Sequence, residues 1–476
     1  MIAAAVLATY AACRRPNWFL AVLAGAPALL VVVIPLFGGN VDTLSMGPMG
    51  LRTSDPGAIA ILIGIMYHGR SHAVRSLRRH PGGTVLGIIA IFLTAKVLAT
   101  VMMAGNAIAS NGLSNTLGGG LVAALGEIRD DLLAIIAPVF AVVAGRHLRL
   151  SRMTVPFVVA IGIILSQAAF HIVDHGQIWS GTGDNRFIGA SEAVTLTLLS
   201  LVIFFIPAAK PRRRLIRSIA CFAFAVAILS DNRSQWLASL CGIGVLSALI
   251  IAGKLMLWKD RRSGPLYVLS VVIVVVSGAA LVAATDVLPV AFETTGTSTR
   301  MKALTDPGSD ATSVWRMQLW RARIEQTSDS WAWGRVLGDR PLTLINGTWL
   351  SAPNHNAYVT AFELGGVFLL GLVIALWGAL VLEGFRRTRT AGPAASSWAP
   401  AVALAVIAAS LAFGTAYDFP MIGPMLATTL LLRTSGTSCV IRRLVACPAQ
   451  TVNVGGGEKG YQNGGEVVPC QGKRSE

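Results

Sequence analysis

The sequence predicts an all-α polytopic membrane protein, and three observations carry that prediction. Charged residues make up only 13% of the 476 residues, hydrophobic residues make up 54%, and the mean hydropathy is +0.65. A soluble globular chain carries about 25% charged residues, so this composition excludes a soluble enzyme, a disordered protein and a coiled coil. The apolar runs are continuous and do not alternate, which excludes a transmembrane β-barrel.

About twelve transmembrane helices are expected, because each crossing of about 30 Å of hydrocarbon takes about 20 apolar residues. The second and the last are short. The opening apolar stretch, residues 1–13, rises only about 20 Å as a helix, so it either lies in the interface or forms a short extra span. The twelve predicted spans are 18–38, 55–68, 83–104, 121–144, 153–172, 190–209, 215–231, 234–252, 265–285, 357–382, 398–417 and 420–433.

Basic residues orient these spans. Clusters of Lys and Arg fall in every second loop, whereas the short loops between them carry only Arg52, Arg186 and Arg233. Cytoplasmic loops hold such an excess of Lys and Arg, so the net charge of +16 reflects topology and no nucleic-acid partner is expected. The cytoplasmic clusters begin at Arg14, Arg70, Arg146, Lys210, Lys254 and Arg386.

Four regions follow from this topology. Residues 1–285 hold spans one to nine, residues 286–356 form a long periplasmic loop, residues 357–433 hold spans ten to twelve, and residues 434–476 form a disordered cytoplasmic tail. Within the loop, Val314, Met317, Trp320 and Ile324 have helical spacing. That spacing predicts an amphipathic helix over 313–328, on or near the outer membrane face.

Familiar soluble motifs are missing from the sequence. It has no P-loop and no Asp-x-Asp pair, and its six cysteines have no metal-ligand spacing and none lies in the long loop. We therefore expect no metal, no cofactor and no disulfide framework. Function must lie in polar residues on the outer face or inside the helix bundle.

A histidine and three arginines are the candidate groups. His355 lies between Asn354 and Asn356, directly before a strong span, and histidine is the side chain best matched to proton transfer near neutral pH. The alternative for His355 is a helix-cap residue at the interface. Arg186, Arg233 and Arg316 are isolated on the exterior side, where a guanidinium fits a phosphate with two parallel hydrogen bonds.

Other roles are open for these and neighbouring groups. The arginines could bind lipid headgroups or pair with Asp184, Asp231 or Asp310. Glu363 follows His355 by eight residues, which places it near the same helical face about 12 Å away, and it could pair with an arginine of the core. The loop tryptophans, Trp331, Trp333 and Trp349, are expected as interface anchors, with sugar stacking as the alternative.

Three segments resemble the O-antigen ligase and O-antigen polymerase superfamily of bacterial membrane glycosyltransferases. They are Arg186-Phe-Ile-Gly189, the turn Ser230-Asp-Asn-Arg-Ser-Gln-Trp236, and Ser313 to Trp320 followed by Asn354-His-Asn-Ala-Tyr-Val-Thr-Ala-Phe-Glu-Leu-Gly-Gly366. The turn departs from the family pattern, because Asp-Asn separates Ser230 from Arg233 and Ser234 replaces the usual glycine.

The resemblance implies a metal-independent glycan transfer on the exterior face of the bacterial inner membrane. The donor would be a glycan on undecaprenyl diphosphate, and the acceptor would be lipid A–core for a ligase or a growing lipid-linked glycan for a polymerase. The catalytic residues would be His355, Arg316 and Arg233. Substrate contacts would come from Arg186, Asn354, Asn356, Glu363 and Arg321. A lipid-linked glycan flippase is the rival from another functional class.

Overall fold

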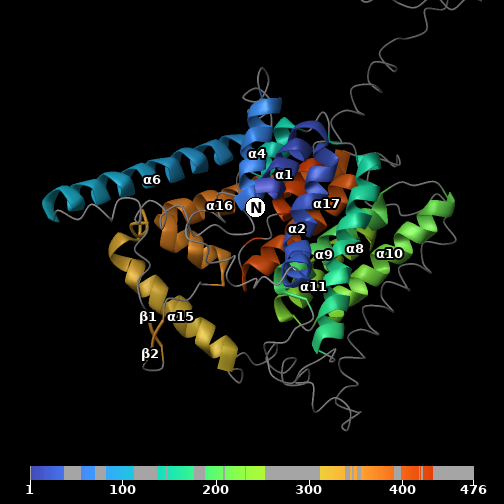
Figure 1. The fold of residues 1–476 in the computed structure, drawn as a ribbon. Helices are drawn as coiled ribbons and strands as arrows, with labels where there is room; N and C mark the ends of the chain where they lie inside the picture. The colour runs from blue at the N-terminus through green and yellow to red at the C-terminus, as the bar shows by residue number, and fades with distance from the viewer. Residues whose placement is uncertain are drawn as a thin grey trace, which may run out of the picture. The chain divides into compact units, whose positions relative to one another are not determined.

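The computed structural model is helical, with one small hairpin. It describes residues 2–36, 55–69, 82–111, 137–144, 148, 150–175, 188–206, 210–230, 232–251, 311–337, 343–345, 348–350, 355–390, 398–417, 419 and 422–431. Predictions for 121–136, for span 265–285 and for the tail 434–476 lie outside these residues. The helices are α1 (Ile2–Arg14), α2 (Pro16–Leu36), α4 (Asp55–His68), α6 (Gly83–Asn111), α8 (Leu150–His175), α9 (Ala190–Phe205), α10 (Lys210–Leu229), α11 (Arg233–Ile251), α15 (Ala311–Thr327), α16 (Ala357–Thr390) and α17 (Trp398–Gly414) (Figure 1).

The helical class is therefore confirmed, and four helices are long and apolar enough to cross a membrane. These windows are Gly83–Thr100, Arg152–Phe170, Ser234–Ile251 and Ala357–Arg389. Shorter apolar helices occupy Ile59–His68, Ala190–Phe205, Trp398–Gly414 and Ile422–Leu431. These findings indicate a membrane protein, while the count of twelve spans stays a prediction.

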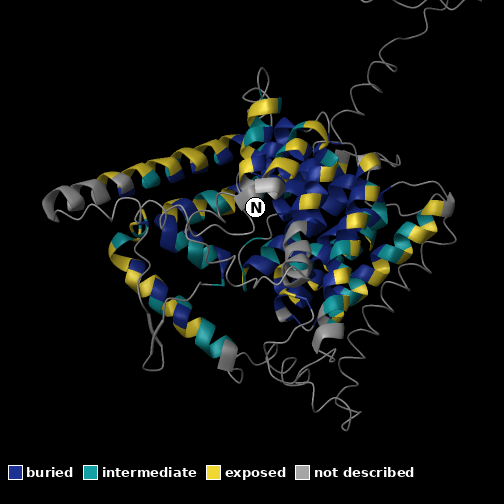
Figure 2. Cartoon of the chain, in the orientation of Figure 1, coloured by how far each residue is buried: buried dark blue, intermediate teal, exposed yellow. Residues whose placement is uncertain are grey.

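Small residues let the central helices pack closely. α11 lies along α17, and a Cβ placed on Gly242 of α11 would lie 3.3 Å from the carbonyl oxygen of Ala405 and 3.4 Å from the Cβ of Ala409. Close approach at such residues is typical of helix pairs in membranes. Figure 2 shows the resulting buried centre, with exposed residues along α6, α10 and α15.

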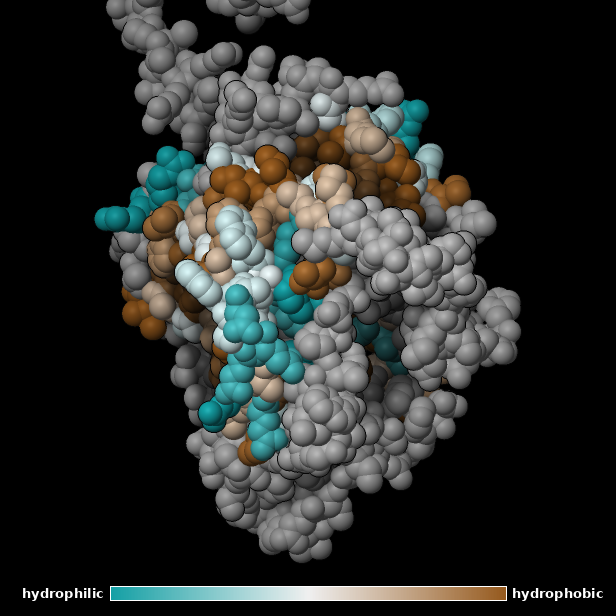
Figure 3. All heavy atoms as spheres, turned by 90° about the vertical axis from the view of Figure 1, so that its left-hand side faces the viewer, coloured by the Kyte–Doolittle hydropathy of each residue, from teal (hydrophilic) through white to brown (hydrophobic). Residues whose placement is uncertain are grey.

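The long loop holds a helix at the predicted position, although Met317 and Ile324 of the expected apolar face are exposed, and an element that the sequence did not predict. α15 spans Ala311–Thr327, close to the expected 313–328, and a 3₁₀ turn follows at Ser328–Ser330. Strands β1 (Thr343–Ile345) and β2 (Thr348–Leu350) then pair as an antiparallel hairpin. On the face shown in Figure 3, apolar described residues gather in the upper part and hydrophilic ones form a strip below them.

The predicted continuous span 357–382 is wrong in one respect, because α16 is broken after its eighth residue. Gly365 and Gly366 have non-helical backbone angles, and Gly366 has φ 61° and ψ −159°, a region that is open essentially to glycine alone. The break divides α16 into a short first part, residues 357–364, and a long second part, residues 367–390. The apolar composition of residues 357–382 predicted an unbroken helix despite the Gly365-Gly366 pair.

Candidate functional site

His355 lies just before the first turn of α16, on a strained backbone. Its φ is 49°, the one positive value among the described residues other than glycine. A left-handed conformation at a non-glycine residue costs about 1–2 kcal/mol, and such strain often marks functional sites. His355 therefore does not share a helical face with Glu363, and the expectation that it does is wrong.

Asn356 holds this strained residue in place. Its side-chain oxygen accepts hydrogen bonds from the backbone N–H groups of Tyr358 at 3.0 Å and Val359 at 3.1 Å, and its Nδ2 donates to the Thr415 carbonyl at 2.9 Å. These bonds make Asn356 the N-cap of α16. These bonds occupy the amide oxygen and one amide N–H, so Asn356 positions its neighbour.

Tyr417, which follows α17, brings His355 and Arg316 together. The His355 ring meets the Tyr417 ring edge to face, with 5.5 Å between ring centres. On the same tyrosine, the guanidinium carbon of Arg316 lies 5.2 Å from the ring centre, a cation–π distance, while Arg316 Nη1 donates to the Ala416 carbonyl at 3.4 Å. The loop helix thereby delivers a permanent positive charge to the start of α16.

The surroundings of His355 favour the neutral form of its imidazole. Partial burial, and secondly the positive charge of Arg316, lower the pKa of His355 below its ordinary value of about 6.5. A neutral imidazole can accept a proton at pH 7. The Nε of Arg316 is buried and has no hydrogen-bond partner within the described part of the chain. His355 thus offers a proton acceptor, and Arg316 offers a cation whose Nε–H can donate a further hydrogen bond.

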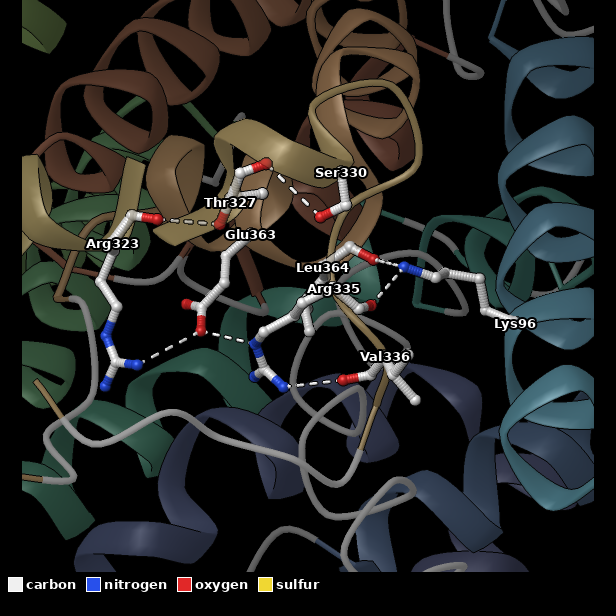
Figure 4. Close-up of polar contacts among 8 residues, drawn as sticks. All are labelled: Lys96, Arg323, Thr327, Ser330, Arg335, Val336, Glu363 and Leu364. Carbon is white, nitrogen blue, oxygen red and sulfur yellow. Dashed lines mark hydrogen bonds and ion pairs between the residues drawn. The ribbon is translucent and has the colours of Figure 1, made fainter. Parts of the chain in front are cut away.

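A second polar cluster secures the other end of α15 (Figure 4). The carboxylate of Glu363 lies 3.7 Å from Nη1 of Arg323 and 2.6 Å from Nε of Arg335. The exposed fractions of the Arg323 and Glu363 side chains are only 1% and 5%. Burial of a charge is tolerable when it is paired and hydrogen-bonded, so Glu363 is a structural counter-ion, as one of the sequence-based alternatives had it.

Residues 331–335, here called the strap, close the break in α16. The N–H of Val367 donates to the Trp331 carbonyl at 2.8 Å, and the N–H of Arg335 donates to the Glu363 carbonyl at 2.9 Å. A Cβ on Gly334 would lie 2.5 Å from the Gly365 nitrogen, so the strap and the break touch backbone to backbone. Backbone groups freed at a helix end need such partners.

Lys96 of α6 completes the closure. Its ammonium donates to the carbonyl of Arg335 at 2.7 Å and to the carbonyl of Leu364, at the end of the short first part of α16 (Figure 4). It also donates to the carbonyl of Trp333 at 2.6 Å. A cation stabilises the C-terminal end of a helix. Three segments that are distant in sequence therefore meet at one ammonium group.

The structure brings some of the predicted site residues together and leaves others apart. His355, Arg316 and Asn356 meet at the start of α16, and Glu363 belongs to the second cluster. Arg321 lies on the exposed face of α15 and pairs with Glu325 at 2.9 Å. Arg233 is the first residue of α11, but its side chain lies outside the described residues, as do Arg186, Asn354, Trp349, Asp184, Asp231 and Asp310.

Sequence reasoning missed Tyr417, the strap contacts and the capping role of Lys96. For Tyr417 the available signal was an aromatic residue at the very end of a predicted span, in Gly414-Thr-Ala-Tyr-Asp-Phe419. For the break, it was the pair Gly365-Gly366, which no helix interior favours. For Lys96, the signal was a lone cation inside an apolar segment, a position that usually has a named partner.

The fold and the site together define a helical membrane protein with a histidine–arginine site at the start of a broken helix. No protein-family model matches the chain, and no curated protein matches it significantly.

Proposed function

We propose that this protein is a membrane glycosyltransferase that moves a glycan from undecaprenyl diphosphate to an acceptor sugar, in the manner of an O-antigen ligase. The observation that carries the proposal is the meeting of His355 and Arg316 on the ring of Tyr417. A base and a fixed cation are the two groups that such a transfer needs from the protein.

The chemistry can be followed atom by atom. The acceptor hydroxyl oxygen attacks the anomeric carbon of the donor sugar, and the bond from that carbon to the phosphate oxygen breaks. His355 takes the hydroxyl proton. Arg316 stabilises the negative charge that develops on the departing undecaprenyl diphosphate. The sugar is already activated by its diphosphate, so neither nucleotide nor metal has a required part.

The setting belongs to the proposal as well. We place the protein in a bacterial inner membrane with about twelve spans, its site opening toward the periplasm, and lipid A–core as the acceptor. The alternation of basic loops supports this orientation. Arg233 and Arg186 would add to the diphosphate contacts, and Asn354 and Arg321 to the sugar contacts.

A transfer assay tests the proposal. Purified protein in lipid vesicles receives an undecaprenyl-diphosphate glycan together with lipid A–core or with a second lipid-linked glycan as acceptor. We expect transfer to lipid A–core, unchanged in EDTA. Transfer only to the lipid-linked glycan would make the protein a polymerase. Movement of the donor across the vesicle membrane without transfer of its glycan would make the protein a flippase and would overturn the proposal.

A further inference from the structure

The short first part of α16 folds back along the second part. The rings of Tyr358 and Trp377 both contact Phe419, with ring centres 5.4 Å and 5.3 Å from it. Ala357 and Trp377 also line the same apolar cavity of about 40 Å³. In a straight helix, residues 358 and 377 would be separated by about 28 Å. The break at Gly366 therefore turns the chain back on itself.

An exposed aromatic cluster surrounds the bend. It consists of Phe92, Trp331, Trp333 and Phe368, and the ring centres of Phe92, Trp333 and Phe368 lie 5.0–6.1 Å apart. The two tryptophans are 60% and 61% exposed. Exposed apolar side chains also occur along α6 and α16, two helices long and apolar enough to cross a membrane.

The spacing along α16 then fixes where a bilayer can lie. No charged residue occurs between Val367 and Leu382, a length of about 24 Å that approaches the hydrocarbon thickness of about 30 Å. Glu383, bonded to Arg386 and Arg387, marks the opposite end. If the outer boundary lay at Trp377 instead, only about 8 Å of apolar helix would remain before Glu383, too little to cross.

We propose that the aromatic cluster is a lipid-interface anchor and marks the outer boundary of the bilayer. Tryptophan favours this boundary because its ring is apolar and its N–H is polar. Trp377 follows Gly366 by eleven residues, or about 16 Å of helix. The site at His355 is thus recessed to about half the depth of the bilayer, and the short first part of α16 is a re-entrant half-helix.

A recessed site needs water around it. Non-helical backbone at membrane depth is tolerated only where protein buries it or where it lines an aqueous cavity, and His355 and Arg316 are both partly exposed. The site therefore opens to the exterior through a hydrated vestibule. The consequence for the substrate rests on the proposed function: the donor diphosphate would have to leave the headgroup level and move inward to reach Arg316.

Spin labels test the depth without any substrate. In full-length protein whose six cysteines are replaced, single cysteines at Trp333, Ile374 and Leu382 are labelled and the protein is reconstituted in lipid vesicles. Accessibility to oxygen and to a nickel chelate then reports depth. We expect the Trp333 label near the phosphates, the Ile374 label about 10 Å deeper, and the Leu382 label near the opposite interface. A Trp333 label in bulk water, or an Ile374 label at an interface, would overturn the boundary.

A thiol reagent tests the vestibule. We expect Thr360→Cys, on the half-helix, to react with a small charged reagent added to the exterior. Ile374→Cys, 56% exposed and inside the proposed hydrocarbon layer, should not react. Absence of reaction at position 360 would overturn the vestibule.

If a labelled variant fails to insert, brominated lipids report the depth instead, because they quench tryptophan fluorescence. Trp333→Phe must then remove part of the quenching by lipids brominated near the headgroup. Neither result depends on glycan transfer, so the two proposals can fail separately.

Discussion

The guanidinium carbon of Arg316 lies 5.2 Å from the centre of the Tyr417 ring, although the two residues are far apart in the sequence. Arg316 belongs to the loop helix α15, and Tyr417 follows the last turn of α17. The same ring contacts His355. Tyr417 is therefore the platform on which the base and the cation of the proposed reaction are held together.

Removal of either group should abolish transfer. We expect His355→Ala and Arg316→Ala each to lower the transfer rate by at least about 100-fold, the usual contribution of a general base or a charge-stabilising donor. Gln318→Ala, an exposed position on the same helix as Arg316, serves as the control and should keep the normal rate. Membrane insertion is checked by extraction and chromatography. Full activity in both site variants would contradict the assignment of His355 and Arg316 as catalytic residues.

The pH dependence follows from the lowered pKa of His355. The neutral imidazole is the active form, so transfer should be constant near pH 7 and fall only as the pH drops below the ordinary histidine value of about 6.5. In Arg316→Gln burial, the larger cause, still lowers this pKa, but the contribution of the neighbouring cation is gone, so the acid limb of the residual rate should move to higher pH. The measurement is kcat/KM against pH, with Arg316→Lys as the charge-conserving control. An acid limb that stays in place in Arg316→Gln would contradict the coupling.

The backbone of Gly366 should not tolerate a side chain. In Gly366→Ala the new Cβ would lie 2.3 Å from the Trp331 carbonyl oxygen, and φ would remain at 61°. We expect a loss of about 2 kcal/mol or more and a lower thermal unfolding midpoint in detergent. Gly371→Ala, five residues further along the helix with nothing within 4 Å of its Cβ, is the matched control and should be neutral or slightly stabilising. Equal unfolding midpoints for the two variants would contradict the close backbone contact between the strap and Gly366.

The buried carboxylate of Glu363 should matter far more than an exposed one. Glu363→Gln leaves Arg323 and Arg335 without the charge that compensates them, which we expect to cost about 3–5 kcal/mol. Glu325→Gln breaks only the exposed pair with Arg321 and should cost no more than about 1 kcal/mol. Thermal unfolding in detergent compares the two variants. If the Glu363→Gln protein were as stable as Glu325→Gln, the ion pairs of Glu363 would not stabilise the fold.

The sequence by itself determined the helical membrane class, most helix positions and three members of the candidate site. Apolar length and the distribution of Lys and Arg are local properties, so they can be read without knowing what any helix touches. The loop helix followed from its spacing for the same reason. His355 stood out because polar groups next to long apolar segments are rare, and Arg316 because an isolated exterior guanidinium fits a phosphate.

Only the tertiary structure decided how these residues are used. Gly365-Gly366 breaks α16 because the strap and Lys96 supply partners for the freed backbone groups, and those partners come from remote parts of the chain. Glu363 became a counter-ion because Arg323 and Arg335 reach it, and Tyr417 joined the site because α17 ends beside His355. Which side chains meet across such distances depends on the packing of whole helices, and no local pattern encodes it.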